Sequence, residues 1–130
     1  MKIIVGYDMT DPAERALDTA IDYAERLKAD LQVIASLVGG GKESVEEIHA
    51  FEKGLKSARM KASRKGVSCE THLLMRGKTP GEDLVAFAEE QSADLIVIGV
   101  KKRSKVGKLM FGSTAQYVIL EGGCPVLAAK

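Results

Sequence analysis

Hydrophobic and polar positions follow two alternating periodicities along this chain. Short runs rich in β-branched residues are typical of strands buried on both faces. They alternate with longer stretches in which apolar residues recur every three or four positions, as on one face of a helix. The pattern predicts strands at residues 2–7, 31–38, 67–75, 95–98 and 126–129. It predicts helices over residues 11–27, from about 43 to 65, from 80 onward and over 113–120.

This alternation of strands and helices predicts an α/β fold. Strands joined by helical crossovers run parallel, and right-handed crossovers distribute the helices over both faces of the sheet. We therefore expect an open three-layer α/β sandwich around a five-stranded parallel sheet. Residues 95–98, Leu-Ile-Val-Ile, form the most hydrophobic run and are expected to be the central strand.

Two of the expected helices have clear start signals. Asp11 followed by Pro12 predicts an N-cap acid and a proline at the first helical position. Thr79, Pro80 and Glu82 have the spacing of a capping box, in which the threonine hydroxyl and the glutamate carboxylate each accept a backbone N–H.

Size and composition limit the functions that are open to this chain. Its 130 residues, of which 45% are hydrophobic, fit one domain over residues 1–130 with a single continuous core. The 19 basic and 18 acidic residues give a net charge of +1, which argues against a globally basic nucleic-acid binder. No apolar run is long enough to cross a membrane, so neither a membrane span nor a signal peptide is expected.

The cysteines and histidines do not predict a metal or catalytic centre. Cys69 and Cys124 lack metal-binding or redox spacing, and two reduced thiols in a cytoplasmic protein are the expectation. His49 falls on a polar helix and His72 within a strand, both away from the edge where ligands bind. We therefore see no paired acid–base constellation that would demand an enzyme.

The candidate site lies at the carboxyl ends of the strands, where open parallel sheets bind ligands. Those ends hold Tyr7 and Asp8, Ser36 and Leu37, Arg76 and Gly77, and Gly99 and Val100. A long connection then returns to Gly112, Ser113 and Thr114, which open the last helix with free N–H groups suited to phosphate. Basic residues crowd this connection: Lys101, Lys102, Arg103, Lys105 and Lys108. It contains no aromatic residue before Phe111, so nucleic-acid stacking is not expected.

Other phosphate-binding and catalytic patterns are absent. Gly39, Gly40, Gly41 and Lys42 lack the first glycine and the final Ser or Thr of a P-loop. No G-x-G-x-x-G follows the first strand, and no G-x-S-x-G elbow occurs. The third strand ends at Arg76 rather than at the acid that a response-regulator receiver would need.

Several short motifs together resemble the universal stress protein family of the UspA type, over essentially the whole chain. They are Ile4-Val5-Gly6-Tyr7-Asp8, Ala13-Glu14-Arg15-Ala16-Leu17, Gly77-Lys78-Thr79-Pro80, Ala93-Asp94-Leu95-Ile96-Val97-Ile98-Gly99, Gly112-Ser113-Thr114-Ala115 and Cys124-Pro125-Val126-Leu127. The resemblance implies a Rossmann-like fold, similar to the adenine nucleotide alpha hydrolases, with strand order 3-2-1-4-5.

The resemblance also implies an ATP site, with or without magnesium held through Asp8. The implied site residues are Gly6, Tyr7, Asp8, Ser36, Gly99, Val100, Lys102, Gly112, Ser113, Thr114 and Ala115. The family signature G-x2-G-x9-G-[ST] starts at Gly99 and ends at Gly112 and Ser113, but Lys102 replaces its middle glycine. If Lys102 closes the site, no nucleotide is expected.

A homodimer through the last strand is the remaining implication of the resemblance. Val126, Leu127 and Ala128 would form an apolar edge that pairing with a second copy removes. Three functions stay open at this point. They are an ATP-binding regulatory dimer with a protein partner not identified by the sequence, a nucleotide-free interaction module of the same fold, and a weak ATP hydrolase or autophosphorylating protein.

Overall fold

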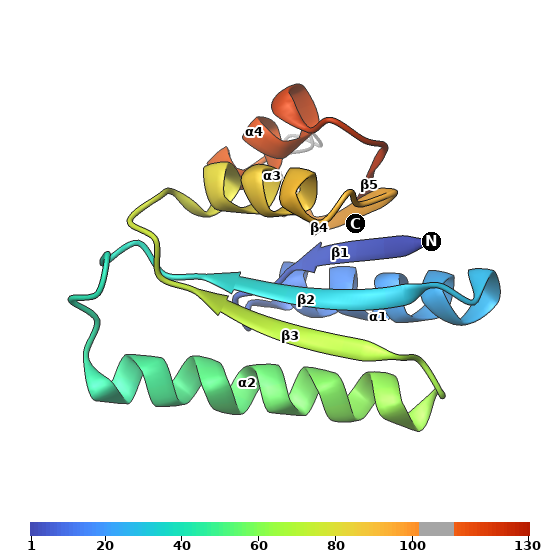
Figure 1. Ribbon diagram of the computed structural model, residues 1–130, viewed down its shortest axis with the longest axis horizontal. Helices are drawn as coiled ribbons and strands as arrows, with labels where there is room; N and C mark the ends of the chain where they lie inside the picture. Colours follow the sequence, from blue (N-terminus) through green and yellow to red (C-terminus); the bar gives the residue numbers. More distant parts are fainter. Residues whose placement is uncertain (102–110) are drawn as a thin grey trace.

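The computed structural model describes residues 1–101 and 111–130 (Figure 1). Its elements in chain order are β1 (Lys2–Gly6), α1 (Asp11–Leu27), β2 (Asp30–Ser36), α2 (Val45–Arg64), β3 (Cys69–Leu74), α3 (Pro80–Glu90), β4 (Leu95–Gly99), α4 (Ser113–Glu121) and β5 (Val126–Ala129). The strands pair in parallel in the order β3-β2-β1-β4-β5. The predicted α/β fold and its strand order are therefore confirmed.

The strand at the middle of the sheet is β1 rather than β4. β1 pairs with β2 on one side and with β4 on the other, and β4 lies between β1 and β5. The prediction that residues 95–98 form the central strand is thus wrong by one position. Both strands are interior and covered on both faces, so hydrophobicity alone cannot distinguish them.

Four elements are shorter than the hydrophobic pattern predicts, and β1, which ends at Gly6 rather than at Tyr7, is one of them. β2 ends at Ser36, and Val38 beyond it is exposed. β3 begins at Cys69 because Val67 still belongs to the turn after α2, where its N–H donates to the carbonyl of Ala62 at 3.0 Å. α2 begins at Val45, two residues after the predicted start.

The N-cap of α1 is Thr10, not the predicted Asp11. The Thr10 hydroxyl accepts the N–H of Ala13 at 3.4 Å, and Asp11 and Pro12 occupy the first two helical positions. Two adjacent residues here are both good N-caps, and the more N-terminal one is used. The predicted capping box at the start of α3 is present.

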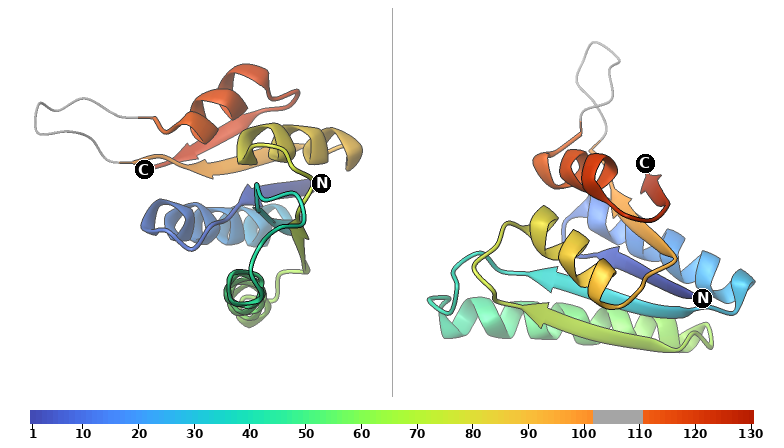
Figure 2. Two further views of the ribbon diagram at one scale, coloured as in Figure 1. Left: turned by 90° about the vertical axis from the view of Figure 1, so that its left-hand side faces the viewer. Right: turned by 45° about the horizontal axis from the view of Figure 1, so that its top comes forward.

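Two helices cover each face of the sheet, α1 and α2 on one side and α3 and α4 on the other (Figures 1 and 2). Because side chains alternate along a strand, β1 contributes to both cores. Ile3 and Val5 pack with Leu17 of α1, whereas Ile4 packs with Leu84 of α3. The sheet is therefore buried on both faces, as a parallel sheet requires.

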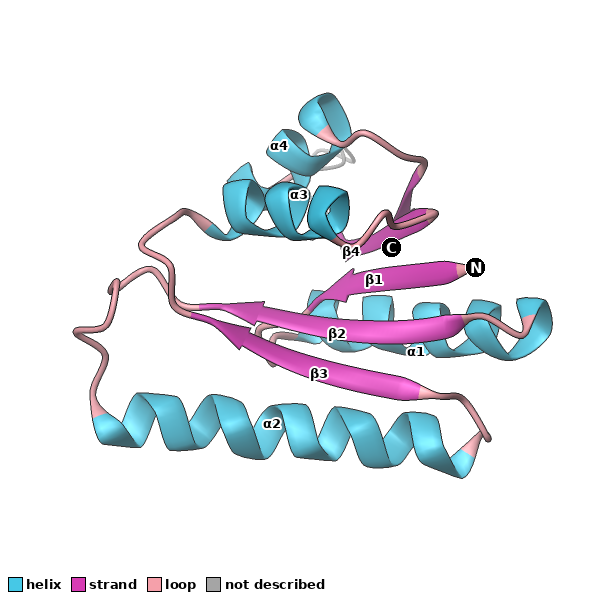
Figure 3. Ribbon diagram, viewed as in Figure 1, coloured by secondary structure: helices cyan, strands magenta, loops and turns pink. Residues whose placement is uncertain are grey.

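The arrowheads of β1, β2 and β3 point the same way in Figure 3, as do all strands of this parallel sheet. The helices α1, α3 and α4 begin at the edge where β1, β3 and β4 end. The topology thus gathers strand C-termini and helix N-termini along one edge. Within the described residues, no helix is long and apolar enough to cross a membrane.

Candidate functional site

A cleft of about 350 Å³ opens at the carboxyl edge of the sheet. It lies at the ends of β1 and β4, where the strand order reverses, which is the usual ligand position in such sheets. Small-molecule sites have volumes of roughly 300–1,000 Å³, so this cleft is large enough for one. The described residues that line it are Gly6, Tyr7, Asp8, Thr10, Pro12, Ala13, Ile34, Ser36, Pro80, Leu84, Ile98, Gly99, Lys101, Gly112, Ser113, Thr114 and Ala115.

Most of the predicted site residues meet in this cleft. Those that line it are Gly6, Tyr7, Asp8, Ser36, Gly99, Gly112, Ser113, Thr114 and Ala115. Val100 is not among them, because its side chain is buried in the core beneath α3 and α4. Lys102 lies outside the described residues. The nucleotide-binding role of the whole set stays a prediction.

The first turn of α4 lies at the cleft, and no described side chain caps its backbone N–H groups. The other helices begin with a hydroxyl side chain that accepts such an N–H, namely Thr10, Ser44 and Thr79. α4 begins after Gly112, which has no side chain to cap it. The first bond within α4 joins the N–H of Gln116 to the Gly112 carbonyl at 3.0 Å. The N–H groups of residues 113–115 therefore have no partner within the helix, and with the helix dipole they suit an anion.

The two described glycines of the signature, Gly99 and Gly112, differ in whether packing requires a glycine at the position. At Gly99, a β-carbon would collide with the carbonyl group of Pro12, so close packing of α1 on β4 requires glycine there. At Gly112, φ is −67°, and no described atom lies within 4 Å of the position that a β-carbon would take. Packing and backbone strain therefore do not require glycine at 112, and the open space in front of it belongs to the cleft.

Asp8 and Tyr7 close the β1 side of the cleft. The exposed Asp8 accepts the Thr10 N–H at 3.1 Å and the Thr10 hydroxyl at 2.5 Å, which ties the loop after β1 to the start of α1. The buried Tyr7 hydroxyl donates to Glu14. Burial, together with the Glu14 carboxylate, raises the pKa of Tyr7 well above its ordinary value. Tyr7 is therefore protonated at neutral pH and acts as a donor rather than as a base.

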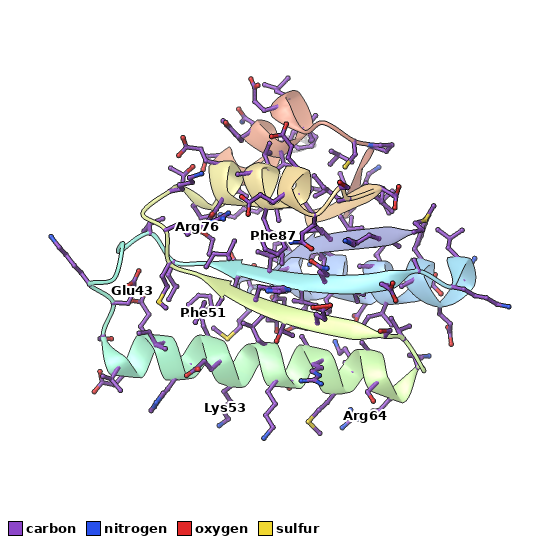
Figure 4. The ribbon with its side chains drawn as sticks, viewed as in Figure 1. Glu43, Phe51, Lys53, Arg64, Arg76 and Phe87 are labelled. Carbon is purple, nitrogen blue, oxygen red and sulfur yellow. The ribbon has the colours of Figure 1, made fainter. Side chains whose placement is uncertain are left out.

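On the β2 side, Ser36 belongs to a buried polar network. Its hydroxyl donates to Asp83 Oδ2 at 2.7 Å. Asp83, in the first turn of α3, has no exposed surface, and its Oδ1 accepts from Arg76 Nε at 2.6 Å. Arg76 lies just beyond the end of β3, near the start of α3 (Figure 4). It also donates to both Glu90 oxygens at 3.0 Å.

Sequence reasoning misses this network. The hydrophobic pattern places Arg76 correctly at a strand end, and Asp83 falls in the polar first turn of a helix, where acids are common without a partner. The signal that was available is the position of Asp83 one residue before Leu84, on the side of α3 that faces the sheet. An acid at such a place needs a cation or several donors.

The cleft does not resemble a metal centre or a histidine-dependent active site. Within residues 1–101 and 111–130, no three His, Cys, Asp or Glu side chains gather as metal ligands would. His72 lies on β3, with its ring centroid 4.9 Å from that of Phe87, and His49 is exposed on α2. Asp8 is the one acid among the described residues that line the cleft, and a single carboxylate holds Mg²⁺ only together with ligand phosphates.

Comparison with known proteins gives a consistent result. The model of the universal stress protein family matches residues 1–130. A universal stress protein of Methanocaldococcus jannaschii is 31% identical over 140 residues, covering 99% of this chain and 81% of that protein.

Two solved structures from Archaeoglobus fulgidus are similar over the whole chain. The first is a universal stress protein with 43% identity and a TM-score of 0.90, covering 100% of this chain and 98% of the other. The second is a universal stress protein in complex with dAMP, with 38% identity, a TM-score of 0.86 and the same coverage.

Proposed function

We propose that this chain, which belongs to the universal stress protein family, binds an adenine nucleotide such as ATP in the cleft at the carboxyl edge. The observation that carries the proposal is the uncapped first turn of α4, which opens into that cleft beside the unobstructed Gly112. The complex of the Archaeoglobus relative with dAMP supports the same class of ligand.

The phosphates would lie at α4. The N–H groups of residues 113–115 donate to phosphate oxygens, and the hydroxyls of Ser113 and Thr114 add two further donors. The ammonium group of Lys101, which also lines the cleft, supplies positive charge. Gly112 allows the phosphates to approach the backbone closely.

The base would lie on the opposite side, between β2 and α3. Ile34, Pro80 and Leu84 make this part of the wall apolar, and Ser36 is its polar group. A flat heteroaromatic base gains from burial against such a surface, whereas phosphates do not. Asp8 at the end of β1 lies between these two regions and would meet the ribose or a Mg²⁺ ion carried by the phosphates.

Calorimetric titration of the purified chain with ATP, with and without magnesium, tests this proposal. Binding at micromolar to low millimolar ATP supports it, and the absence of heat and of equilibrium-dialysis binding at several millimolar ATP contradicts it. Because the chain has no tryptophan, a nucleotide that co-purifies appears as excess absorbance near 260 nm. Extraction of that material and chromatography against AMP, ADP and ATP standards identifies it.

We also propose a homodimer through β5, in which nucleotide occupancy regulates a protein partner. β5 is an edge strand with Val126, Leu127 and Ala128 half-buried. The carbonyls of Pro125 and Ala129 accept from the N–H groups of Ile96 in β4 and of Val100 just after it, at 3.0 and 2.9 Å. By alternation, the main-chain groups of Val126 and Ala128 point to the free edge, where an antiparallel copy could pair.

A further inference from the structure

The hydroxyl of Ser36 has only one proton, and the network beneath the cleft uses it. Ser36 Oγ donates to Asp83 Oδ2 at 2.7 Å, although Ser36 also lines the cleft. A serine hydroxyl has one donor and two acceptor lone pairs. With the proton directed at Asp83, the lone pairs are what Ser36 can offer to a ligand.

Asp83 is the acceptor in this bond, because it forms an ion pair with Arg76. It is fully buried, and Arg76 Nε donates to its Oδ1 at 2.6 Å. Arg76 Nη2 reaches the Asp83 main-chain oxygen at 3.4 Å, and Glu90 holds the other side of the guanidinium. Arginine stays protonated in proteins, and an ionised carboxylate only accepts hydrogen bonds. The direction of the Ser36–Asp83 bond is therefore fixed.

Among the described residues on this side of the cleft, Ser36 is the polar one and its neighbours are apolar. Ile34 precedes it on β2, and Pro80 and Leu84 of α3 lie on the same side of the cleft. The first turn of α4, where we propose that the phosphates bind, follows β4, which lies on the other side of β1 from β2. A ligand base that fills the apolar side thus meets one hydrogen-bond acceptor, Ser36 Oγ. If the base also presents an acceptor there, the two oxygens face each other with no proton between them, and no hydrogen bond forms.

We propose that Asp83 is a positioning residue that sets the hydrogen-bond polarity of Ser36, so that the cleft selects a 6-amino purine over a 6-oxo purine. The amino group donates to Ser36 Oγ, whereas a 6-oxo group has no proton to offer. This inference rests on the proposed nucleotide function, and it names the feature that distinguishes one purine from another.

Paired titrations with ATP and inosine triphosphate test the inference. The two probes share their ribose and phosphates. ATP has an amino group at the 6 position of its base, whereas inosine triphosphate has an oxo group there and a proton on N1. The unaltered chain is expected to bind ATP roughly tenfold or more tightly than inosine triphosphate. Equal affinities overturn the inference and leave nucleotide binding intact. Failure of both probes to bind at several millimolar overturns the nucleotide function, and this inference with it.

Three variants separate positioning from a structural role. Ser36→Ala removes the acceptor and should bring the ratio of the two affinities close to one. Asp83→Asn should direct its oxygen to Arg76 and its NH₂ to Ser36 Oγ, which frees the serine proton for the cleft. The ratio should then reverse in favour of inosine triphosphate. Glu90→Gln alters the same network without touching Ser36, and as the matched control it should keep the original ratio.

If Asp83 had a merely structural role, its substitution would weaken the binding of both probes equally and leave the ratio of their affinities unchanged. Full ATP preference in Ser36→Ala, or in a folded Asp83→Asn variant, overturns the inference. If Asp83→Asn does not fold by circular dichroism, Ser36→Ala and Glu90→Gln decide it, because both leave the contact between Asp83 and Arg76 Nε in place.

Discussion

The carbonyl group of Pro12 occupies the space in which a β-carbon on Gly99 would lie. Gly99 ends β4 and Pro12 is in the first turn of α1, so this contact joins two elements far apart in the sequence. It also brings α1 against the end of β4 at the wall of the cleft. The first glycine of the signature therefore has a packing role, whatever else it contacts.

Gly99→Ala should be strongly destabilising. Because backbone atoms of Pro12 block the methyl group, β4 and α1 must separate, and overpacking of this kind costs about 1–3 kcal/mol or more. Urea unfolding followed by circular dichroism measures the loss. Gly112→Ala is the matched control, since its methyl group meets no described atom and should cost less than about 1 kcal/mol. Similar losses in both variants would contradict the packing role of Gly99.

Gly112→Val should abolish or severely weaken nucleotide binding while the protein stays folded. The valine side chain would extend into the cleft in front of the free N–H groups of α4, where we place the phosphates. We expect an affinity loss of at least roughly tenfold, or about 1.4 kcal/mol, by calorimetry. Gly123→Val lies in the turn beyond the other end of α4 and serves as the control with unchanged affinity. Unaltered binding in Gly112→Val would refute the placement of the site.

The stability of the protein should fall between pH 9 and pH 11 in a way that depends on Cys69. Burial raises the pKa of this thiol to about 11, from 9.0 for an unperturbed cysteine. In this window the unfolded thiol loses its proton while the folded one keeps it, so rising pH favours unfolding. The unaltered chain should therefore lose stability more steeply than Cys69→Ala, as measured by urea unfolding at a series of pH values. Parallel curves would show that the thiol titrates alike in both states.

Ala128→Pro should shift a β5-mediated dimer to monomers. Alternation along β5 points the Ala128 N–H to the free edge, so proline removes a donor for a second copy and leaves the bonds to β4 intact. Sedimentation equilibrium of the variant and the unaltered chain measures the change. Lys130→Ala, beyond the strand, removes a charged side chain but no N–H of the free edge, so it should leave the assembly as it is. A dimer that survives Ala128→Pro is built on another surface.

Much of the fold could be predicted because local patterns and tertiary structure agree. β1, β2, β4 and β5 are largely apolar runs, whereas the edge strand β3 is more polar. The amphipathic stripe of α1 faces the core, as the sequence predicts. The errors occur where two local solutions are nearly equal. Thr10 and Asp11 are both good N-cap residues. Thr10 is the N-cap in the structure, where it also donates hydrogen bonds to Asp8, and these bonds depend on the path of the chain after β1.

The sequence predicts at which edge of the sheet the candidate site lies, but it does not predict the hydrogen-bond network of Ser36, Asp83 and Arg76. Strand ends and a glycine before a helix mark the edge in the sequence, and most of the residues so marked line the cleft. The pairing of Asp83 with Arg76 and Ser36 depends on how α3 lies over β2 and β3, which no short motif encodes. Val100 lies outside the lining of the cleft for a related reason, since a residue one step beyond a strand end can turn inward as easily as outward.

The tight turn after α4 has a geometric consequence. A β-carbon on Gly122 would press on the carbonyl of Val118 and on the side chain of Val126, so the end of α4 and the start of β5 are packed directly together. With about 1.5 Å of rise per residue, α4 spans only roughly 14 Å between the cleft at Ser113 and the turn before β5. The cleft and the edge strand proposed for pairing therefore lie at the two ends of one short helix.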